Sequence, residues 1–183
     1  MKRQWMILVL SVLLLLLLAG ACSRSSIPSA EGGPSAGAPG GAPAVKPEFS
    51  YINTGDVRAK PQLISGWHSI EDGAWRWTAR EAQAVLATPR DLPVNFEMRL
   101  YFPDQHMRRV GGPVTVAILL DGKPFVQETY PAPGPRTILK PVPAGSLSKP
   151  ATSVTIRLDR ALGPSDADRR ELGVVVQGFG FQK

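Results

Sequence analysis

The stretch VTVAILLDGKPFV, residues 114–126, carries the clearest signal for a fold. Large aliphatic side chains stand at every second position from 114 to 120, which is the spacing of a strand with one buried face. Asp121 and Gly122 follow, a residue pair favoured in two-residue hairpin turns because both central positions require positive φ. A second strand then begins near Pro124, because proline is tolerated at the start of a strand. The stretch therefore predicts a β-hairpin.

The same alternation recurs on both sides of this hairpin. It appears at residues 94–100, at 154–158 and at 172–176, and the last run leads into Gly-Phe-Gly-Phe at 178–181. Prolines fall mostly between the runs. Residues 79–87 would accept a helical turn or two, and they fit a strand as well. We therefore expect eight or nine strands without alternating helices.

A series of short strands separated by turn signals is typical of an all-β antiparallel sandwich. We expect this fold over residues 48–183, with a jelly-roll-like arrangement first and an immunoglobulin-like sandwich as the alternative. The chain has one cysteine, so no disulfide within it can hold the domain together and packing must do so.

The first 21 residues have the organisation of a secretory signal peptide. Lys2 and Arg3 form a positive start, and an apolar run follows over residues 5–19. The run is shorter than the roughly 20 residues that span a bilayer comfortably, so cleavage is expected and an uncleaved anchor is the alternative. The small residues at 19–21 suit the cleft of a signal peptidase. We therefore expect residues 1–21 to be removed.

Cys22 follows the cleavage site directly. The sequence Leu-Ala-Gly-Ala-Cys at 18–22 resembles a bacterial lipobox, with the leucine one position further from the cysteine than usual. In that motif the cysteine sulfur receives a diacylglyceryl group and the cysteine becomes the new N-terminus. Residues 19–21 also form an ordinary A-x-A site, which cuts the same bond and leaves Cys22 unmodified. We expect lipidation, because Cys22 is the only cysteine and a tether-like segment follows it.

Residues 22–47 combine this cysteine with a segment made almost wholly of Ser, Gly, Ala and Pro. Such a composition buries too little apolar surface to offset the entropy of ordering, so we expect a disordered linker. The protein is then expected to be a membrane-anchored lipoprotein of the bacterial cell envelope. Ser23 resembles the sorting pattern for the outer membrane or cell surface of Gram-negative bacteria.

The formal net charge of +6 does not indicate a nucleic-acid partner. Four of the 21 basic residues and one of the 15 acidic residues precede Glu48, which leaves a net charge of +3 on the predicted domain. The basic residues of that domain are scattered, whereas phosphate binding needs a clustered stripe of charge. We therefore expect no nucleic acid among the partners.

Two segments of the domain resemble a pattern found in β-sandwich modules of bacterial envelope proteins. The first is Gly-Trp-His at 66–68 with Glu71 and Trp-Arg-Trp-Thr at 75–78, and the second is Asp-Arg-Arg-Glu-Leu-Gly-Val at 168–174. These modules are similar to galactose-binding-like, carbohydrate-binding jelly rolls. The resemblance covers roughly residues 62–181, implies the fold more than an activity, and supplies no catalytic residue. At position 68 the related pattern more often has Tyr than His.

Trp67, Trp75 and Trp77 are the first candidates for ligand binding. Trp75 and Trp77 share one face of an expected strand, because side chains alternate along it. An exposed pair of indoles can stack on the C–H face of a sugar ring while nearby polar groups bond its hydroxyls. The preferred interpretation is that these tryptophans belong to the core, where each buries a large apolar area.

Tyr101, Asp104 and His106 are further ligand candidates, because they follow a strong strand at a place where sandwich loops often carry ligands. A calcium site of Asp104 and backbone oxygens has no further support in the sequence. His68 and His106 are the only histidines, and neither has metal-ligand spacing. We expect no metal and no cofactor.

Charged residues of the two resembling segments form one cluster if those segments meet. The predicted members are Glu71, Arg76, Arg169, Arg170 and Glu171. A structural clasp of arginine and carboxylate is the preferred interpretation. A polar ligand site is the second, and a pair of glycosidase carboxyls, which requires about 5–9 Å between them, is the third.

Three functional hypotheses follow, in order. The first is a lipid-anchored envelope protein, not an enzyme, whose sandwich binds a glycan or another envelope component. The second is a structural or assembly lipoprotein that docks on an envelope protein through an exposed strand edge or apolar patch. The third is an envelope hydrolase.

Overall fold

A computed structural model describes residues 45–91 and 93–183 of the chain. These residues belong to one compact unit, Gly41–Lys183. The predicted signal peptide at 1–21, Cys22 and the predicted linker as far as residue 44 lie outside the described residues. Within the described ranges, no helix has the length and apolar character needed to cross a membrane.

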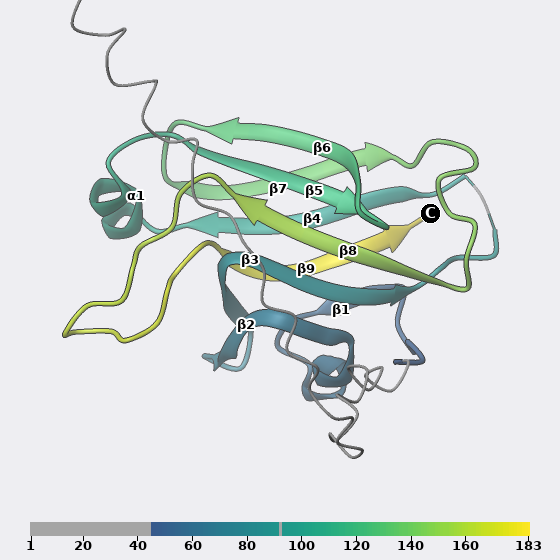
Figure 1. Ribbon diagram of the computed structural model, residues 1–183, viewed down its shortest axis with the longest axis horizontal. Coiled ribbons are helices and arrows are strands. Elements are labelled where there is room, and N and C mark those ends of the chain that lie inside the picture. The colour runs from purple at the N-terminus through teal and green to yellow at the C-terminus, as the bar shows by residue number, and fades with distance from the viewer. Residues whose placement is uncertain (1–44, 92) are drawn as a thin grey trace, which may run out of the picture. The chain divides into compact units, whose positions relative to one another are not determined.

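The described chain forms nine strands, one 3-10 helix and one short α-helix (Figure 1). The strands are β1 (Tyr51–Asn53), β2 (Leu63–Glu71), β3 (Trp75–Ala87), β4 (Asn95–Phe102), β5 (Val114–Leu120), β6 (Lys123–Tyr130), β7 (Gly134–Pro141), β8 (Ala151–Leu158) and β9 (Val175–Gln182). The helices are η1 (Val57–Gln62) and α1 (Asp104–Val110). The number of strands agrees with the eight or nine that the alternating runs predict.

The strands form an antiparallel ladder in the order β6-β5-β8-β3-β9-β4-β7, with β1 added to β9 and β2 added to β3. β3 is the strand at which the ladder turns from one layer to the other. Its residues 81–87 pair with β8, whereas Arg76 and Trp77 pair with β9. The first half of β3 therefore belongs with β9 and β4, and the second half with β8 and β5.

The layer β6-β5-β8 packs face to face on the layer β9-β4-β7. Ring contacts join β4 and β6, which lie in opposite halves of the ladder. The ring centroid of Phe96 lies 5.8 Å from that of Phe125, and the centroid of Phe102 lies 5.2 Å from that of Tyr130. From β3 to β9, every connection except the β5–β6 hairpin crosses between the layers, as in a jelly roll (Figure 1). This arrangement confirms the predicted antiparallel, jelly-roll-like β-sandwich.

The predicted β5–β6 hairpin is present. Its two turn residues both have positive φ, 49° at Asp121 and 78° at Gly122. This is the backbone conformation that the Asp-Gly pair favours, and it fits the right-handed twist of the two strands. The turn is therefore a case in which local chemistry alone specifies the structure.

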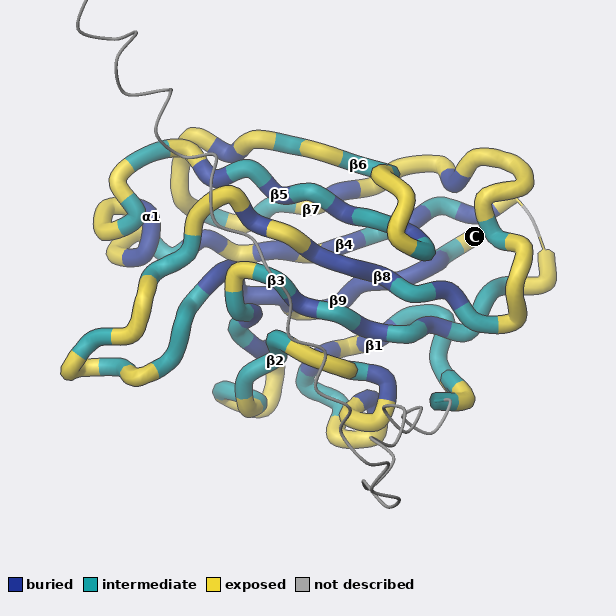
Figure 2. The backbone as a smooth tube through the Cα atoms, in the orientation of Figure 1, coloured by how far each residue is buried: buried dark blue, intermediate teal, exposed yellow. Residues whose placement is uncertain are grey.

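Alternating residues of the central strands fill the core (Figure 2). On β4 the side chains at 96, 98, 100 and 102 are buried, and on β5 those at 114, 116, 118 and 120 are buried. Phe96, Phe102 and Phe179 are among the largest fully buried side chains. The opposite face of β3, β9 and β4 is left accessible, and the candidate site lies there.

Residues 104–110 form helix α1, where the sequence predicts a loop. The helix ends at Gly111, whose φ of 75° is left-handed and whose N–H bonds to the backbone oxygen of Met107. His106 and Met107 are the buried residues of the helix. Because only two adjacent residues are buried, the sequence shows no helical period. Residues 79–87, whose sequence fits either a helical turn or a strand, form part of strand β3.

Candidate functional site

Trp75 and Trp77 lie on the outer face of the first half of β3. The residues that alternate with them, Arg76 and Thr78, are buried, whereas both tryptophans are partly exposed. The two-residue period of the strand produces this division. The structure thus places Trp75 and Trp77 on the solvent side of the sheet.

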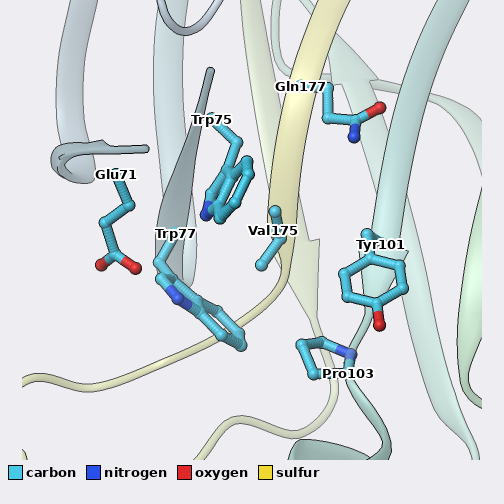
Figure 3. A pocket seen from close by; sticks show the side chains of 7 residues that line it. All are labelled: Glu71, Trp75, Trp77, Tyr101, Pro103, Val175 and Gln177. Carbon is cyan, nitrogen blue, oxygen red and sulfur yellow. The ribbon is translucent and has the colours of Figure 1, made fainter. Parts of the chain in front are cut away.

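Strand pairing sets three side chains side by side on this face. Val175 of β9 pairs with Trp77 of β3 on one side and with Tyr101 of β4 on the other. Directly paired residues point to the same face of a sheet, so an indole and a phenol ring flank Val175 (Figure 3). Tyr101 is 39% exposed, unlike its buried neighbours Leu100 and Phe102. The result is an aromatic face open to solvent.

A cavity of about 400 Å³ opens on this face, and we call it the aromatic cavity (Figure 3). Its lining residues are Glu71, Trp75, Trp77, Tyr101, Pro103, Val175 and Gln177. A mostly apolar lining with a few polar groups is typical of small-molecule sites, where the polar groups orient the ligand. Trp75, Trp77 and Tyr101, three of the six ligand candidates from the sequence, meet here.

A second cavity of about 420 Å³ shares Gln177 with the first, and we call it the polar cavity. Its lining residues are Asn53, Gly55, Asp56, Gly73, Ala74, Arg99 and Gln177. Arg99 donates to Asn53 Oδ1 at 3.0 Å, and its Nε lies 3.7 Å from Glu97. Asp56 is held by Arg58, with the shortest contact at 2.6 Å. The charged groups of this cavity are therefore paired.

A tight turn brings Glu71 to the edge of the aromatic cavity. Asp72 and Gly73 have φ values of 47° and 66°, and the N–H of Ala74 donates to the backbone oxygen of Glu71 at 3.0 Å. Glu71 and Trp75 then become cross-strand partners of β2 and β3. Figure 3 shows Glu71 on the side of the tryptophans opposite to Tyr101. A carboxylate thus stands next to the indole pair.

Trp67 has a different environment from the other two candidate tryptophans. It stacks on Phe179 with ring centroids 5.2 Å apart and planes inclined by 7°. Its indole N–H donates to the backbone oxygen of Gln83 at 2.9 Å. Trp67 packs against the core and is not among the residues that line the aromatic cavity. Its role is structural, so the three tryptophans do not act as one platform.

Asp104 and His106 lie on α1 and line neither cavity. Asp104 is exposed, whereas His106 is buried with its ring centroid 5.1 Å from that of Trp77. Neither ring nitrogen of His106 has a hydrogen-bond partner among the described residues. Burial, together with the nearby charge of Arg109, lowers the pKa of His106 to about 4. The imidazole is therefore neutral at pH 7 and packs against the Trp77 ring.

Arg170 joins the segment at 66–78 to the segment at 168–174. Its Nη1 donates to Glu71 Oε1 at 2.6 Å, and its Nε and Nη2 donate to the Asp168 carboxylate at 3.0 and 2.8 Å. The bonds from Arg170 lower the pKa of Asp168 to about 2, and the two carboxylates raise the pKa of Arg170. Glu71 therefore belongs both to the aromatic cavity and to this ion-pair group.

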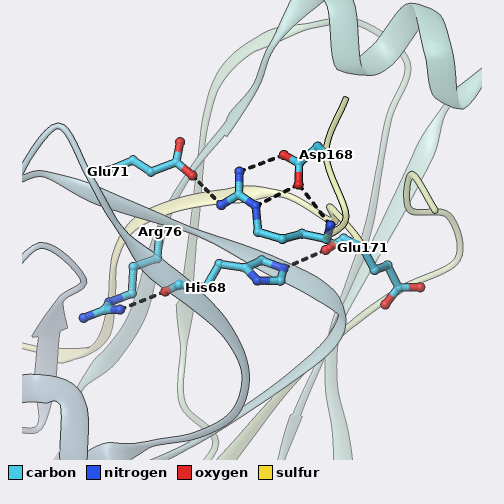
Figure 4. Close-up of polar contacts among 6 residues, drawn as sticks. His68, Glu71, Arg76, Asp168 and Glu171 are labelled. Carbon is cyan, nitrogen blue, oxygen red and sulfur yellow. Dashed lines mark hydrogen bonds and ion pairs between the residues drawn. The ribbon is translucent and has the colours of Figure 1, made fainter. Parts of the chain in front are cut away.

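Arg76 does not join the ion-pair group, contrary to the predicted cluster. It points into the protein, where Nε donates to the backbone oxygen of Thr54 at 2.9 Å and Nη1 to that of His68 at 2.8 Å (Figure 4). Desolvation lowers the pKa of Arg76 from its usual range. The alternation that exposes Trp75 and Trp77 sends this side chain to the opposite face.

Arg169 and Glu171 also lie apart from the Arg170 group. Arg169 pairs with exposed Asp166 at 3.2 Å. The Glu171 carboxylate accepts from the backbone N–H of Arg80 at 2.9 Å. Of the five residues predicted to cluster, only Glu71 and Arg170 are in contact. Within residues 45–91 and 93–183, no three His, Cys, Asp or Glu side chains are placed to hold a metal ion.

Pro103, Val175 and Gln177 line the aromatic cavity and were not predicted as site residues. Val175 and Gln177 stand on either side of Val176 along β9; Gln177 is exposed, whereas Val175 is buried, with 4% of its surface accessible. Because side chains alternate along a strand, both point away from the face on which Val176 joins the core. Only the pairing of β9 with β3 and β4 brings them to the aromatic face, and the sequence does not reveal that pairing.

A scan of family models and a search of curated proteins return no match for this sequence. Several solved structures are similar to part of the chain. One is a family GH115 4-O-methyl-α-glucuronidase with specificity for decorated arabinogalactans. It has a TM-score of 0.44 and 14% identity over 73% of this chain, which spans 17% of that enzyme's length.

Two carbohydrate-binding modules are similar at about the same level. A family 35 module from an environmental isolate has a TM-score of 0.42 and 9% identity, covering 67% of this chain and 91% of its own. Module CBM36, in complex with calcium and xylotriose, has a TM-score of 0.41 and 10% identity, covering 73% of this chain and 100% of its own. These values are too low to transfer a property, so the fold rests on the strand pairing described above.

Proposed function

We propose that this protein binds a glycan in the aromatic cavity and performs no catalysis on it. The observation that carries the proposal is the placement of Trp75 and Trp77 on the solvent side of β3, next to Tyr101. Indoles bury a large apolar area when covered, and grouped apolar surface on a soluble domain marks a binding site. The C–H face of a sugar ring is a fitting cover for an indole.

The polar groups around the tryptophans suit a hydroxyl-rich ligand. Gln177 offers an amide with both donors and an acceptor, and Glu71 offers carboxylate oxygens. The polar cavity continues from Gln177 toward Asn53 and Arg99. A ligand of two or more sugar rings fills both cavities, so an oligosaccharide is a better match than a monosaccharide.

The single carboxylate that lines the aromatic cavity favours ligand binding over hydrolysis. Glu71 is the one carboxylate among its lining residues, and Arg170 holds it at 2.6 Å. Most glycoside hydrolases use two carboxyl groups that flank the bond to be cut. A lone, ion-paired carboxylate serves better to orient a ligand than to transfer a proton.

The proposal places this glycan-binding domain in the bacterial cell envelope, anchored through lipid on Cys22. The support is the sequence, in which a signal-like segment, Cys22 and a Ser/Gly/Ala/Pro-rich stretch precede the domain. A flexible coil of 25 residues spans on the order of 25–30 Å. Such a tether would hold the domain close to the membrane yet leave it free to reach envelope glycans.

A glycan array probed with the full-length chain in detergent micelles tests this function. We expect retained oligosaccharides, and we expect Trp75→Ala and Trp77→Ala to weaken their binding about tenfold or more, because each removes a stacking ring. Leu139→Ala is the matched control: Leu139 is 56% exposed on β7, lines neither cavity, and its loss should leave affinity unchanged.

An array and a polysaccharide pull-down that retain nothing would contradict glycan binding. The structural or assembly role would then be favoured. Crosslinking in intact cells that recovers one envelope protein in stoichiometric amount would support that alternative.

A further inference from the structure

The aromatic cavity has charge of one sign only. Three of its seven lining residues are aromatic, Glu71 is acidic, and none is basic. We infer that the glycan bound there carries a protonated amine, as a polymer of amino sugars does. This inference rests on the proposed function and names the class of glycan.

The ion pair with Arg170 does not cancel the negative charge beside the cavity. Arg170 carries one positive charge and is shared by two carboxylates, Glu71 and Asp168. The three side chains together keep a net charge of −1. Arg170 bonds to Oε1 of Glu71, and Oε2 accepts no hydrogen bond from the described residues. The Glu71 side chain is 33% exposed, so its carboxylate is within reach of a ligand.

The aromatic rings favour the same kind of group. A cation over the face of an indole, within about 6 Å of its centroid, is attracted by the electrons of the ring. Glu71 and Trp75 are cross-strand partners, which places their Cβ atoms about 5 Å apart. One ammonium group can therefore contact the indole face and the carboxylate together. Tryptophan is the best of the aromatic residues for this interaction.

Neutral and acidic glycans match the charge of the aromatic cavity less well than a glycan with a protonated amine does. A neutral sugar stacks on the same rings but leaves the net negative charge uncompensated. An acidic sugar is repelled by Glu71. Among the residues that line the two cavities, the one arginine is Arg99 of the polar cavity, and it already contacts Asn53 and lies 3.7 Å from Glu97. The aromatic cavity itself offers an anion no basic partner.

Three hexasaccharides that differ mainly at the sugar C2 position test the inference. They are the β-1,4-linked hexamers of glucosamine, N-acetylglucosamine and glucose, titrated calorimetrically into the full-length chain in detergent micelles at pH 5.5. We expect the glucosamine hexamer to bind about tenfold more tightly than the other two. This preference should shrink as salt is raised, because the site is open to solvent.

Variants of the ion-pair group should shift the preference in opposite directions. Glu71→Gln removes the carboxylate and should bring the glucosamine hexamer to within about twofold of the neutral hexamers. Arg170→Gln removes the compensating charge and should enlarge the preference. Asp168→Asn, outside the cavity, makes the group neutral and should reduce the preference without touching the ligand. Because Asp168→Asn alters no cavity residue, it keeps the test decisive if Arg170→Gln does not fold.

The outcomes separate the inference from the proposed function. Equal binding of the three hexamers overturns the inference and leaves glycan binding intact. Binding of another glycan on the array, with none of the three hexamers retained, also overturns the inference and leaves glycan binding intact. Equal affinity for hexalysine and the glucosamine hexamer overturns the inference, because the cavity would then recognise charge alone. Retention of no glycan overturns both.

Discussion

Trp67 and Trp75 have the same side chain and different surroundings. Trp67 is stacked on Phe179 and bonded to Gln83, so removing it opens a hole in the packing. Trp75 faces the aromatic cavity, so removing it takes away ligand contact and little else. The role of each tryptophan follows from what covers it.

Replacing these two tryptophans should therefore have opposite effects on stability and binding. We expect Trp67→Ala to lower the free energy of unfolding by about 3–5 kcal/mol, because losing a large, partly buried side chain that packs against the core leaves a cavity. We expect Trp75→Ala to lower it by less than about 1 kcal/mol. Urea denaturation followed by tryptophan fluorescence measures both. Equal losses in the two variants would contradict the division into a structural and a ligand-facing tryptophan.

His106 makes the stability of the domain sensitive to mild acid. In the unfolded chain its pKa is near 6.5, whereas burial lowers the folded value to about 4. Between these values the unfolded state binds more protons, so the free energy of unfolding falls as the pH falls. We expect this residue to account for a loss of about 2–3 kcal/mol between pH 7 and pH 4.5.

The His106→Leu variant isolates that contribution. It keeps an apolar side chain against Trp77 and removes the two ring nitrogens that have no hydrogen-bond partner among the described residues. Urea midpoints measured from pH 7 to pH 4.5 should fall less steeply in the variant than in the parent. Identical slopes would show that the buried imidazole does not control the acid response.

At the scale of elements, β3 decides where the site lies. Its 13 residues pair with β9 at Arg76 and Trp77 and with β8 over 81–87. The segment between β8 and β9 returns to β3 at this change of partner. Gly173 donates its N–H to the backbone oxygen of Thr78 at 2.6 Å, and Leu172 forms an isolated bridge with Leu162. For this reason β9 starts at Val175, later than the alternation from residue 172 predicts.

Close packing at Gly173 predicts a large effect from one added methyl group. A Cβ atom there would lie 2.6 Å from Thr78 Oγ1 and would also meet backbone of β3. We expect Gly173→Ala to lower the free energy of unfolding by about 1–3 kcal/mol, because β3 and the returning segment would have to separate. Thermal unfolding measures this loss.

Gly163→Ala is the matched control in the same connecting segment. A Cβ atom at Gly163 would meet nothing within 4 Å. Its effect should stay within about 0.5 kcal/mol. A similar loss in both variants would mean that the flexibility of the segment, and not the contact with β3, determines the result.

At the scale of the whole molecule, the site depends on three distant parts of the chain. Residues 71–77, 101–103 and 175–177 meet on one outer face because β9 lies between β3 and β4. The core lies on the other side of these strands, so the residues that fold the domain and those that line the cavity alternate along the same strands. Site residues can therefore change with little effect on the core.

The proposed attachment of the whole molecule to a membrane depends on Cys22. We expect Cys22→Ala to move the protein from the membrane fraction to the soluble fraction of cells, because the lipid-bearing sulfur is lost. Fractionation followed by immunoblotting measures this change. Ser26→Ala, nearby and without a thiol, should remain in the membrane fraction. A full-length Cys22→Ala protein that stays membrane-bound would contradict lipid anchoring.

The sequence by itself determined the features that depend on neighbouring residues. Asp121 and Gly122 specify their turn through φ preferences, and the two-residue period marks the buried face of β4 and β5. These signals sufficed to predict an antiparallel sandwich. The same signals did not reveal helix α1, because its two buried residues, His106 and Met107, are adjacent and show no helical period.

Only the tertiary structure decided which of those faces is covered and which residues meet on it. The alternation along β3 places Trp75 and Trp77 on one side of the strand. The two-residue period is the same whether that side faces the core or the solvent, so the sequence does not distinguish the two. Arg76 and Arg170 are the same residue type, and the sequence does not distinguish their environments. In the structure Arg76 donates to two backbone oxygens, whereas Arg170 donates to the Glu71 carboxylate. The pairing of β9 with β3 and β4 settles these questions, because a register between distant strands arises from packing over the whole domain.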